Sequence, residues 1–395
     1  MELKNKYKDR EINLIPNDWQ IVPLEEVGQV VNGLTYTPKD VCSFGILVLR
    51  SSNIQNDVLA FEDNIYVCME VPEHIMVRPG DILICVRNGS RNLIGKTALL
   101  DDRTKGMAFG AFMAVFRSNY GQYINYLFRS HILKRQIDEH LGATINQITN
   151  KSLKSFHIPI PPTDEEINGI ATALSNVDAL LDGLDRLIAK KRNIKQAAMQ
   201  QLLTGKTRLP GFEEEWVRCS LPTVLTKGDG IKIGPFGSQL KKEYLVQNGS
   251  YRVYGQENVY QKDFFFGARY LTSKRFEKLK SCEIKAGDFV ISTMGTIGKC
   301  AIVPPDIRVG IMDSHLIRLR IDQSKLLSEY LLHLFSDDFN YLETQTKKLS
   351  VGGIMEGLST KIVRALDIDY PKSPDEQSAI VTMLSDMDAE IEALE

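Results

Sequence analysis

Residues 88–97, NGSRNLIGKT, contain the residue types that could bind a nucleotide, because they end in the Gly-Lys-Thr of a phosphate-binding P-loop. A P-loop has four residues between its first glycine and the Gly-Lys pair, and it leads from a strand into a helix. Here five residues separate Gly89 from Gly95, and the short, acidic KTALLDD that follows is typical of a strand. The spacing and the context therefore favour a turn between two strands over a nucleotide site.

The chain repeats itself, and this self-similarity is its most informative pattern. The matching pairs are VRPGDILICV (77–86) with IKAGDFVIST (284–293), IGKTALL (94–100) with IGKCAIV (297–303), and PTDEEINGIATALSNVDALLDGLD (162–185) with KSPDEQSAIVTMLSDMDAEIEALE (372–395). The offset between the copies drifts along the chain, as loop insertions between preserved elements would produce. We therefore expect two halves with the same fold.

The second copy of the Gly-Lys loop, STMGTIGKCAI, has lost the long spacer and has Cys300 where a magnesium-binding hydroxyl would be needed. A phosphate site would not tolerate these changes, whereas a turn would. Gly95 and Gly298 are predicted to be turn or bulge glycines. Lys96 and Lys299 are then left as exposed cations.

The composition is that of an ordinary globular protein, with 43% hydrophobic and 25% charged residues among 395 and a formal net charge of −2. No apolar run of about 18 residues and no signal-peptide pattern occurs. The scattered cysteines favour a reducing, cytoplasmic location. The cysteines form no Cys-x-x-Cys pair, and the six histidines have no metal-binding spacing. Neither a metal site nor a disulfide framework is predicted. The cysteines are Cys42, Cys68, Cys85, Cys219, Cys282 and Cys300.

Each half has the same predicted plan, which gives an α+β fold. Residues 20–118 and 217–321 alternate apolar and polar residues between glycine-rich turns, so both are expected to be mostly β. A helix should follow each, near 120–141 and 324–346. A short strand and a proline step then lead into a long helix, the first of which covers about 164–204, spans roughly 60 Å and stops at Gly205.

Both long helices carry apolar residues at alternating spacings of three and four, which predicts an antiparallel coiled coil. The alternative is that each helix packs only on its own domain. The predicted seam consists of Ile167, Ile170, Leu174, Val177, Leu181, Leu184 and Ile188 in the first helix, and of Ile380, Leu384, Met387, Ile391 and Leu394 in the second.

Residues 158–212, from IPIPPTDEEINGI to LLTGKTRLPGF, resemble the central conserved region of specificity subunits of type I restriction–modification systems. GPFGSQLKKEYL (234–245) is similar to the start of a target recognition domain of that family. Glu376 and Gln377 lie in a match to its second conserved region. The resemblance covers essentially the whole chain.

The resemblance implies two pseudo-symmetric, mostly β target recognition domains, at 20–158 and 215–368, joined by the helices of 159–214 and 369–395 as a coiled coil. Each domain would bind half of a split double-stranded DNA target, and the coiled coil would set the spacer. Two methyltransferase subunits using S-adenosylmethionine would dock on the helical region, together with restriction subunits using ATP and magnesium. The chain itself would carry no catalytic residue, metal or cofactor.

The second long helix is about half as long as the first. Residues 7–19, YKDREINLIPNDW, resemble residues 204–216, TGKTRLPGFEEEW, which follow the first helix. We therefore expect segment 1–19 to pack near the coiled coil, and the chain to be circularly permuted with its termini meeting there.

DNA contacts need cations and hydroxyls for phosphates, and forked donors and acceptors for bases. Such residues cluster at matching places in the two halves, although an ordinary solvated role is possible for each alone. Lys96 and Lys299 are predicted phosphate contacts. The other candidates are Arg50, Ser51, Asn53, Arg87, Asn88 and Arg91 in the first half, and Arg252, Tyr254, Gln256, Asn258, Ser314 and His315 in the second.

Two other functions remain open on the sequence alone. One is a self-sufficient DNA-modifying enzyme, although no methyltransferase motif such as Asn-Pro-Pro-aromatic and no nuclease motif occurs. The other is a structural adaptor that joins other subunits and has no DNA sequence preference.

Overall fold

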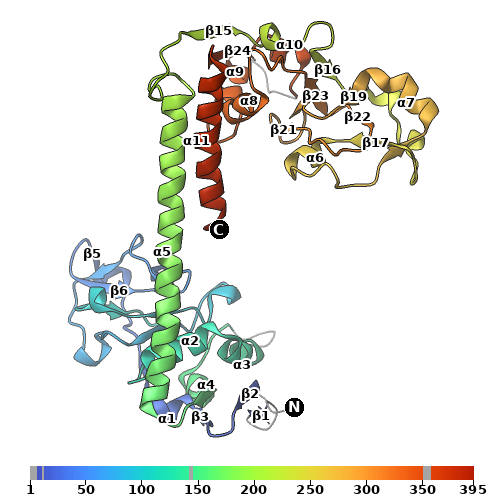
Figure 1. Cartoon of the computed structure of the whole chain (residues 1–395). Coiled ribbons are helices and arrows are strands. Elements are labelled where there is room, and N and C mark those ends of the chain that lie inside the picture. Colours follow the sequence, from blue (N-terminus) through green and yellow to red (C-terminus); the bar gives the residue numbers. More distant parts are fainter. Residues whose placement is uncertain (1–6, 11–12, 142–145, 350–356) are drawn as a thin grey trace. The chain divides into compact units, whose positions relative to one another are not determined.

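A computed structural model describes the chain except for residues 1–6, 11–12, 142–145 and 350–356 (Figure 1). Its contacts divide it into two units, Met1–Asp182 and Gly183–Glu395, termed unit 1 and unit 2. Helix α5 (Asp164–Leu202) continues from one unit into the other. The predicted α+β fold, with two similar strand-rich halves, is confirmed.

Unit 1 contains two four-stranded sheets with the orders β11-β10-β13-β4 and β12-β6-β9-β5. Strand β10 (Ile82–Cys85) is buried on both faces, because Ile82 and Ile84 pack in one hydrophobic cluster and Leu83 and Cys85 in another. Its unbroken apolar sequence, ILIC, follows from this double burial. The other strands of these sheets are β4 (Gln29–Asn32), β5 (Val41–Cys42), β6 (Ile46–Leu49), β9 (Tyr66–Val67), β11 (Thr97–Leu99), β12 (Ala108–Phe109) and β13 (Met113–Arg117).

Unit 2 has the sheet orders β16-β23-β20-β21 and β18-β17-β22-β19. The first sheet repeats that of unit 1. The second shares three strands with its counterpart, because β18, β17 and β22 pair as β9, β6 and β12 do, but its fourth strand lies at the opposite edge. Strand β20 (Phe289–Ser292) corresponds to β10, since Phe289 and Ile291 pack in one cluster and Val290 in another. The other strands are β16 (Ile231–Ile233), β17 (Tyr251–Tyr254), β18 (Tyr270–Leu271), β19 (Glu283–Ile284), β21 (Cys300–Ile302), β22 (Gly310–Met312) and β23 (Leu316–Leu319).

Two-stranded pairs and short helices complete the units. The pairs are β1 (Tyr7–Arg10) with β2 (Asn13–Pro16), β3 (Gln20–Pro23) with β14 (His157–Ile160), β7 (Ile54–Gln55) with β8 (Val58–Leu59), and β15 (Trp216–Ser220) with β24 (Asp367–Pro371). The short helices are α1 (Leu24–Val27), α4 (Asn150–Ser155), α6 (Gln256–Tyr260), α7 (Ser273–Leu279) and α10 (Thr360–Arg364).

The predicted single helices at 120–141 and 324–346 are wrong, because each is broken into two. In unit 1, α2 (Gly121–Arg129) ends at Ser130, whose hydroxyl accepts a hydrogen bond from the Ile132 amide as α3 (His131–Leu141) begins. In unit 2, α8 (Ser328–Leu334) and α9 (Tyr341–Leu349) are separated by residues 335–340, and Asn340, the last of these, has a positive φ of 55°. Both breaks are local backbone features that apolar periodicity does not reveal.

The Gly-Lys loops are turns between antiparallel strands, as predicted. They join β10 to β11 and β20 to β21, and Gly95 and Gly298 have φ values of 87° and 86°. This left-handed conformation favours glycine. The P-loop interpretation is therefore excluded.

The repeated Gly-Asp motif supports the same sheets. Asp81 accepts hydrogen bonds from the Arg78 amide at 2.9 Å and from Arg117 Nη2 at 2.7 Å, and this bond to Asp81 raises the pKa of Arg117. Asp288 likewise accepts from the Lys285 amide at 2.7 Å and from the Arg320 side chain at 2.9 Å. The motif is thus structural in both units.

Helix α11 (Pro374–Glu392) lies beside the C-terminal part of α5 within unit 2 (Figure 1). Lys195 Nζ lies 2.5 Å from Asp388 Oδ1, whereas Arg192, earlier in α5, pairs with Glu395, later in the chain. The two helices are therefore antiparallel. Met199 of α5 is buried in the same cluster as Ile380 and Leu384 of α11.

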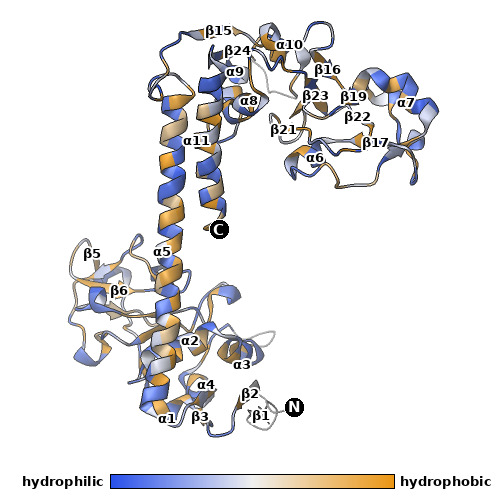
Figure 2. Cartoon of the chain, viewed as in Figure 1, coloured by the Kyte–Doolittle hydropathy of each residue, from blue (hydrophilic) through white to orange (hydrophobic). Residues whose placement is uncertain are grey.

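The predicted apolar seam of α5 is used unevenly, although apolar and polar residues alternate along the helix (Figure 2). Ile167 and Ile170 pack in the core of unit 1. Leu174, Val177 and Leu181 are 40%, 53% and 53% exposed. The middle of the helix thus presents an apolar surface that the described residues leave accessible.

Segment 7–19 contacts the start of α5, because Trp19 Nε1 donates to Glu166 Oε1 at 3.1 Å. In unit 2, Arg208 Nε donates to the corresponding Glu376 at 2.5 Å. The two resembling segments therefore bind matching glutamates. Residues 1–6 lie outside the described part of the chain, and the circular permutation stays a prediction.

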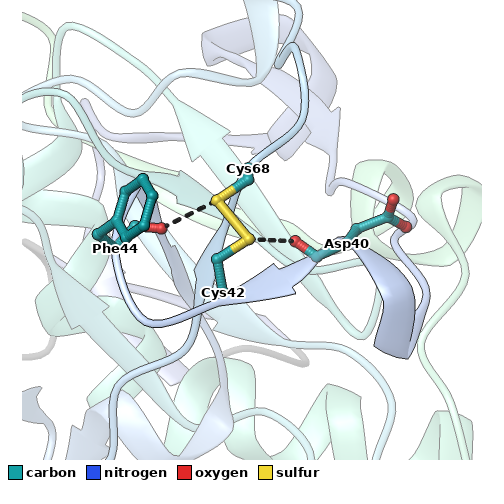
Figure 3. The surroundings of a disulfide bond; sticks show 4 residues. All are labelled: Asp40, Cys42, Phe44 and Cys68. Atoms are coloured by element: carbon teal, nitrogen blue, oxygen red, sulfur yellow. Dashed lines mark hydrogen bonds between the residues drawn. A yellow bond between two sulfur atoms is a disulfide. The ribbon is translucent and has the colours of Figure 1, made fainter.

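No disulfide was predicted from the sequence, but the structure contains one between Cys42 and Cys68, which are 26 residues apart (Figure 3). Antiparallel pairing of β5 with β9 places Cys42 opposite Tyr66, and the Cys68 amide donates to the Asp40 carbonyl at 3.0 Å. The two cysteines therefore lie diagonally across the strand pair, with their Cα atoms 6.0 Å apart. Their sulfur atoms lie 3.8 and 3.3 Å from the carbonyl oxygens of Asp40 and Phe44. These contacts can be hydrogen bonds only in the reduced thiols, because a disulfide sulfur has no proton to donate.

A buried asparagine closes the same turn in each unit. Asn53 Oδ1 accepts from the Arg50 amide at 2.9 Å, and its Nδ2 donates to the Ala60 carbonyl at 3.0 Å. Asn258 Oδ1 accepts from the Gly255 amide at 2.9 Å, and its Nδ2 donates to the Asp263 and Phe266 carbonyls at 2.9 and 2.8 Å. The side chains thus replace backbone partners that the turns lack.

We predict that reduction of the disulfide lowers stability. Opening a loop of this length releases chain entropy in the unfolded state, which corresponds to a loss on the order of 3 kcal/mol. Reductant should lower the Tm of the wild type but not that of Cys42→Ser, and Cys219→Ser should behave like the wild type. Under non-reducing conditions, thiol titration should find four free cysteines. Six would contradict the disulfide.

We also predict that Asn258→Ala and Asn53→Ala each lower the free energy of unfolding by roughly 1–3 kcal/mol, because buried amides and carbonyls lose their partners. Denaturant titration measures the change. Asn92→Ala, at an exposed asparagine, is the matched control and should stay within about 0.5 kcal/mol of the wild type. Unchanged stability in both buried variants would show that these side chains are not structural.

Candidate nucleic-acid interface

The register of the central strands places corresponding residues together in the two units. Cys85 of β10 pairs with Met113 of β13, and Ser292 of β20 pairs with Leu316 of β23. Phe112 and His315 therefore occupy the same place, directly before β13 and β23. Arg87 and Met294 likewise correspond, two residues after β10 and β20.

Backbone hydrogen bonds hold these positions next to each other. The amides of Val86 and Arg87 both donate to the Phe112 carbonyl at 3.1 Å, and the Thr293 amide donates to the His315 carbonyl at 2.9 Å. The residues after β10 and β20 are thus held beside the residues that precede β13 and β23.

In unit 1, four side chains form what we term the first strand-end cluster: Ser51, Arg87, Asn88 and Phe112. The guanidinium carbon of Arg87 lies 5.2 Å from the centroid of the Phe112 ring, and Asn88 Nδ2 donates to Ser51 Oγ at 3.2 Å. Phe112 is 60% exposed. The cluster offers a cation, a hydroxyl, an amide and an aromatic face.

In unit 2, the second strand-end cluster consists of Gln256, Met294, Gly295 and His315. A Cβ atom placed on Gly295 would lie 3.7 Å from Gln256 Nε2, so these two residues are neighbours as Asn88 and Ser51 are. Met294 is 47% exposed and the His315 side chain 43% exposed. Ser314, adjacent to His315, is half-buried. The place is the same as in unit 1, but the chemistry differs.

Four of the predicted DNA contacts are buried and already bonded within the protein. Asn53 and Asn258 close the turns described above. Arg252, 7% exposed, donates to the carbonyls of Phe266 and Gly267, and Tyr254 donates to the Arg308 carbonyl while burial raises its pKa. We therefore leave these four side chains out of the proposed interface. Their matching positions in the repeat reflect a shared structural role.

Other predicted cations are engaged by acceptors of the protein. Lys96 Nζ donates to the Ile54 carbonyl at 2.8 Å, and Lys299 pairs with Asp337. Both lysines were predicted to be exposed cations, but each is half-buried. Arg50 Nη2 pairs with Asp63 at 2.8 Å, and Arg91 Nη2 donates to the Asp138 carbonyl at 3.5 Å.

Phe112, Met294 and Gly295 are not among the candidates predicted from the sequence. Phe112 lies in an apolar run, GAFMAVF, that resembles core sequence. The signal that could have identified it is the repeat itself, because aligning β13 with β23 places Phe112 opposite the candidate His315.

A groove of about 1040 Å³ in unit 2 lies between α5, α11 and the β20–β21 turn. Its charges are largely paired: Lys195 lies 2.9 Å from Asp338 Oδ2 and 2.5 Å from Asp388 Oδ1, and Lys299 pairs with Asp337. The groove therefore lacks the surplus positive charge that a phosphate backbone would require.

Within the described part of the chain, every helix is too short or too polar to span a membrane. No three histidine, cysteine or acidic side chains of that part of the chain come together as a metal-binding group.

Several known proteins are similar to this chain in sequence. It is 27% identical to the EcoKI specificity subunit of Escherichia coli K12, over 51% of this chain and 45% of that protein. It is 24% identical to the StySPI specificity subunit of Salmonella potsdam, over 82% of this chain and 72% of that protein. The chain thus spans about half the length of the first relative.

The fold has also been seen in solved structures. A type I restriction–modification S subunit from M. genitalium aligns with a TM-score of 0.55 and 16% identity, covering 95% of this chain and 91% of that one. The family described as type I restriction modification DNA specificity domain matches residues 16–193 and 232–395. Because these residues form most of the sequence, the chain belongs to this family of DNA specificity domains.

Proposed function

We propose that the chain selects the DNA sequence for a type I restriction–modification complex and that each unit reads one half of a split target. The observation that carries this proposal is the recurrence of one strand-end cluster at equivalent positions with different side chains. Equivalent surfaces on two repeated units suit a target in two parts. Different side chains suit half-sites of different sequence.

The strand-end clusters differ between the units, whereas the buried residues that hold the neighbouring turns and sheets do not. This contrast favours a role of the clusters in DNA recognition over a structural role. The supporting residues are alike in both units, as Asn53 and Asn258 or Asp81 and Asp288 show. At the strand ends, Arg87 and Phe112 are replaced by Met294 and His315. A surface that varies on a constant scaffold is expected where two ligands differ.

Helix α5 provides the means to fix the spacer between the half-sites. Its 39 residues correspond to a length of about 58 Å. Ile167 near its start is buried in the core of unit 1, and Met199 near its end is buried in the core of unit 2. The number of residues between these anchors would therefore set the unspecified DNA length.

The chemistry belongs to partner subunits in this proposal. Two methyltransferase subunits would use S-adenosylmethionine, and restriction subunits would use ATP and magnesium. The exposed Leu174, Val177 and Leu181 of α5 form an apolar surface suited to a helical partner. We assign this surface to methyltransferase docking, and the chain itself would do no chemistry.

We predict that inserting a copy of residues 169–182 after Asp182 lengthens the spacer and leaves both half-sites unchanged. The insertion is two heptads, so it keeps the apolar seam and adds about 21 Å of helix. At about 3.4 Å per base pair, the spacer should grow by up to about six base pairs. Mapping of methylated sites in cells that make the chain with its methyltransferase measures both quantities.

A matched control is the same insertion after Glu213, in the exposed segment that precedes β15. This variant adds the same residues outside α5 and should methylate the wild-type target. If the variant with the α5 insertion still methylates targets that have the wild-type spacer, α5 does not set the distance between the half-sites.

A further inference from the structure

We propose that Arg87, held against Phe112, reads a guanine in the half-site bound by unit 1. This inference rests on the proposed function and goes further, because it names the base and the side chain that recognises it. Phe112 acts in it as a positioning residue.

The first support is the free hydrogen-bonding capacity of Arg87. Of the arginines predicted to contact DNA, Arg50 pairs with Asp63, Arg91 donates to the Asp138 carbonyl, and Arg252 donates to the carbonyls of Phe266 and Gly267. Within the described part of the chain, no hydrogen bond or ion pair engages the Arg87 guanidinium. Its planar set of donors is therefore available to a ligand.

The second support is the contact with Phe112. The guanidinium carbon lies 5.2 Å from the ring centroid, within the range of a cation–π interaction. This contact restricts the long arginine side chain without using its N–H donors. A pre-oriented guanidinium loses less entropy when it binds, which favours a geometrically specific ligand.

The third support is the match between this group and a base edge. Guanine presents O6 and N7 as two acceptors in the major groove, and paired arginine donors fit them. A phosphate would also accept two hydrogen bonds, but it gives no role to an exposed phenylalanine. Phe112 instead orients the guanidinium, and Asn88 with Ser51 lies alongside for an adjacent base.

The fourth support comes from unit 2, where Met294 occupies the place of Arg87. A methionine cannot form the paired hydrogen bonds, so the half-site of unit 2 should lack this mode of guanine recognition. The chain thus supplies its own matched substitution, Arg87→Met, at an exposed position where the same backbone accepts methionine.

The test uses the full chain assembled with its methyltransferase, and DNA duplexes carrying the mapped target. Each guanine of one half-site is replaced in turn by adenine or by 7-deazaguanine, which lacks the N7 acceptor. For the wild type, one guanine-to-adenine change should weaken binding by about 5- to 150-fold, the range of one good bidentate contact. 7-Deazaguanine at that position should also weaken binding.

Arg87→Met should abolish discrimination at that base pair and leave every other position and the second half-site unchanged. Arg87→Lys should lose most of the discrimination at that base pair, because lysine keeps the charge but lacks the planar pair of guanidinium donors. Phe112→Leu should reduce discrimination at the same base pair, and it tests the proposal independently of any substitution at Arg87. Arg50→Met, at an arginine that is already paired, should keep the wild-type discrimination.

Several outcomes would overturn the inference while leaving the proposed function intact. One is a split target with no guanine in the half-site that Arg87→Met affects. Another is an equal loss of affinity for all sequences in Arg87→Met, which would make Arg87 a phosphate contact. If the wild type shows no preference for any split sequence, the proposed function itself fails.

Discussion

The pairing of the central strands, β10 with β13 and β20 with β23, is the constraint on which the rest of the structure depends. Because β10 and β20 are buried on both faces, a shift of one residue would move side chains between the two hydrophobic clusters that each strand separates. The register is therefore fixed by the core. It places Arg87 beside Phe112 and Met294 beside His315 without any contribution from these side chains. The strand ends can consequently vary while the fold stays the same.

Helix α5 links this scaffold to the proposed function, because it contributes to the cores of both units. Ile167 packs in the core of unit 1, and Met199 and Leu202 pack in the core of unit 2. The interaction with α11 covers only the C-terminal part of α5, where Lys195 bonds to Asp388. The remaining apolar surface, at Leu174, Val177 and Leu181, is what a docking partner would require. One helix can therefore join the units and present a surface for a partner.

Much of the fold could be predicted from the sequence, because repetition and apolar periodicity report core packing. The repeat gave the two strand-rich halves, and the second Gly-Lys loop showed that the first is a turn. The site was harder to predict, because residue type does not reveal burial: Asn53, Arg252 and Asn258 resemble DNA-binding residues but bond the backbone. The Cys42–Cys68 bond depends on pairing between short strands far apart in sequence. Phe112 was missed because exposure of an apolar residue is a tertiary property.

Bipartite recognition is best tested by determining the DNA sequences that the wild-type chain selects when it is assembled with its methyltransferase. Random duplexes would be bound, recovered and sequenced, so that every preferred position is found without assuming a target. We predict two short blocks of conserved bases, different from each other and separated by a fixed number of unspecified positions. A single uninterrupted block, or recovery of DNA with no sequence preference, would contradict the claim that two repeated units each read one half of a split target.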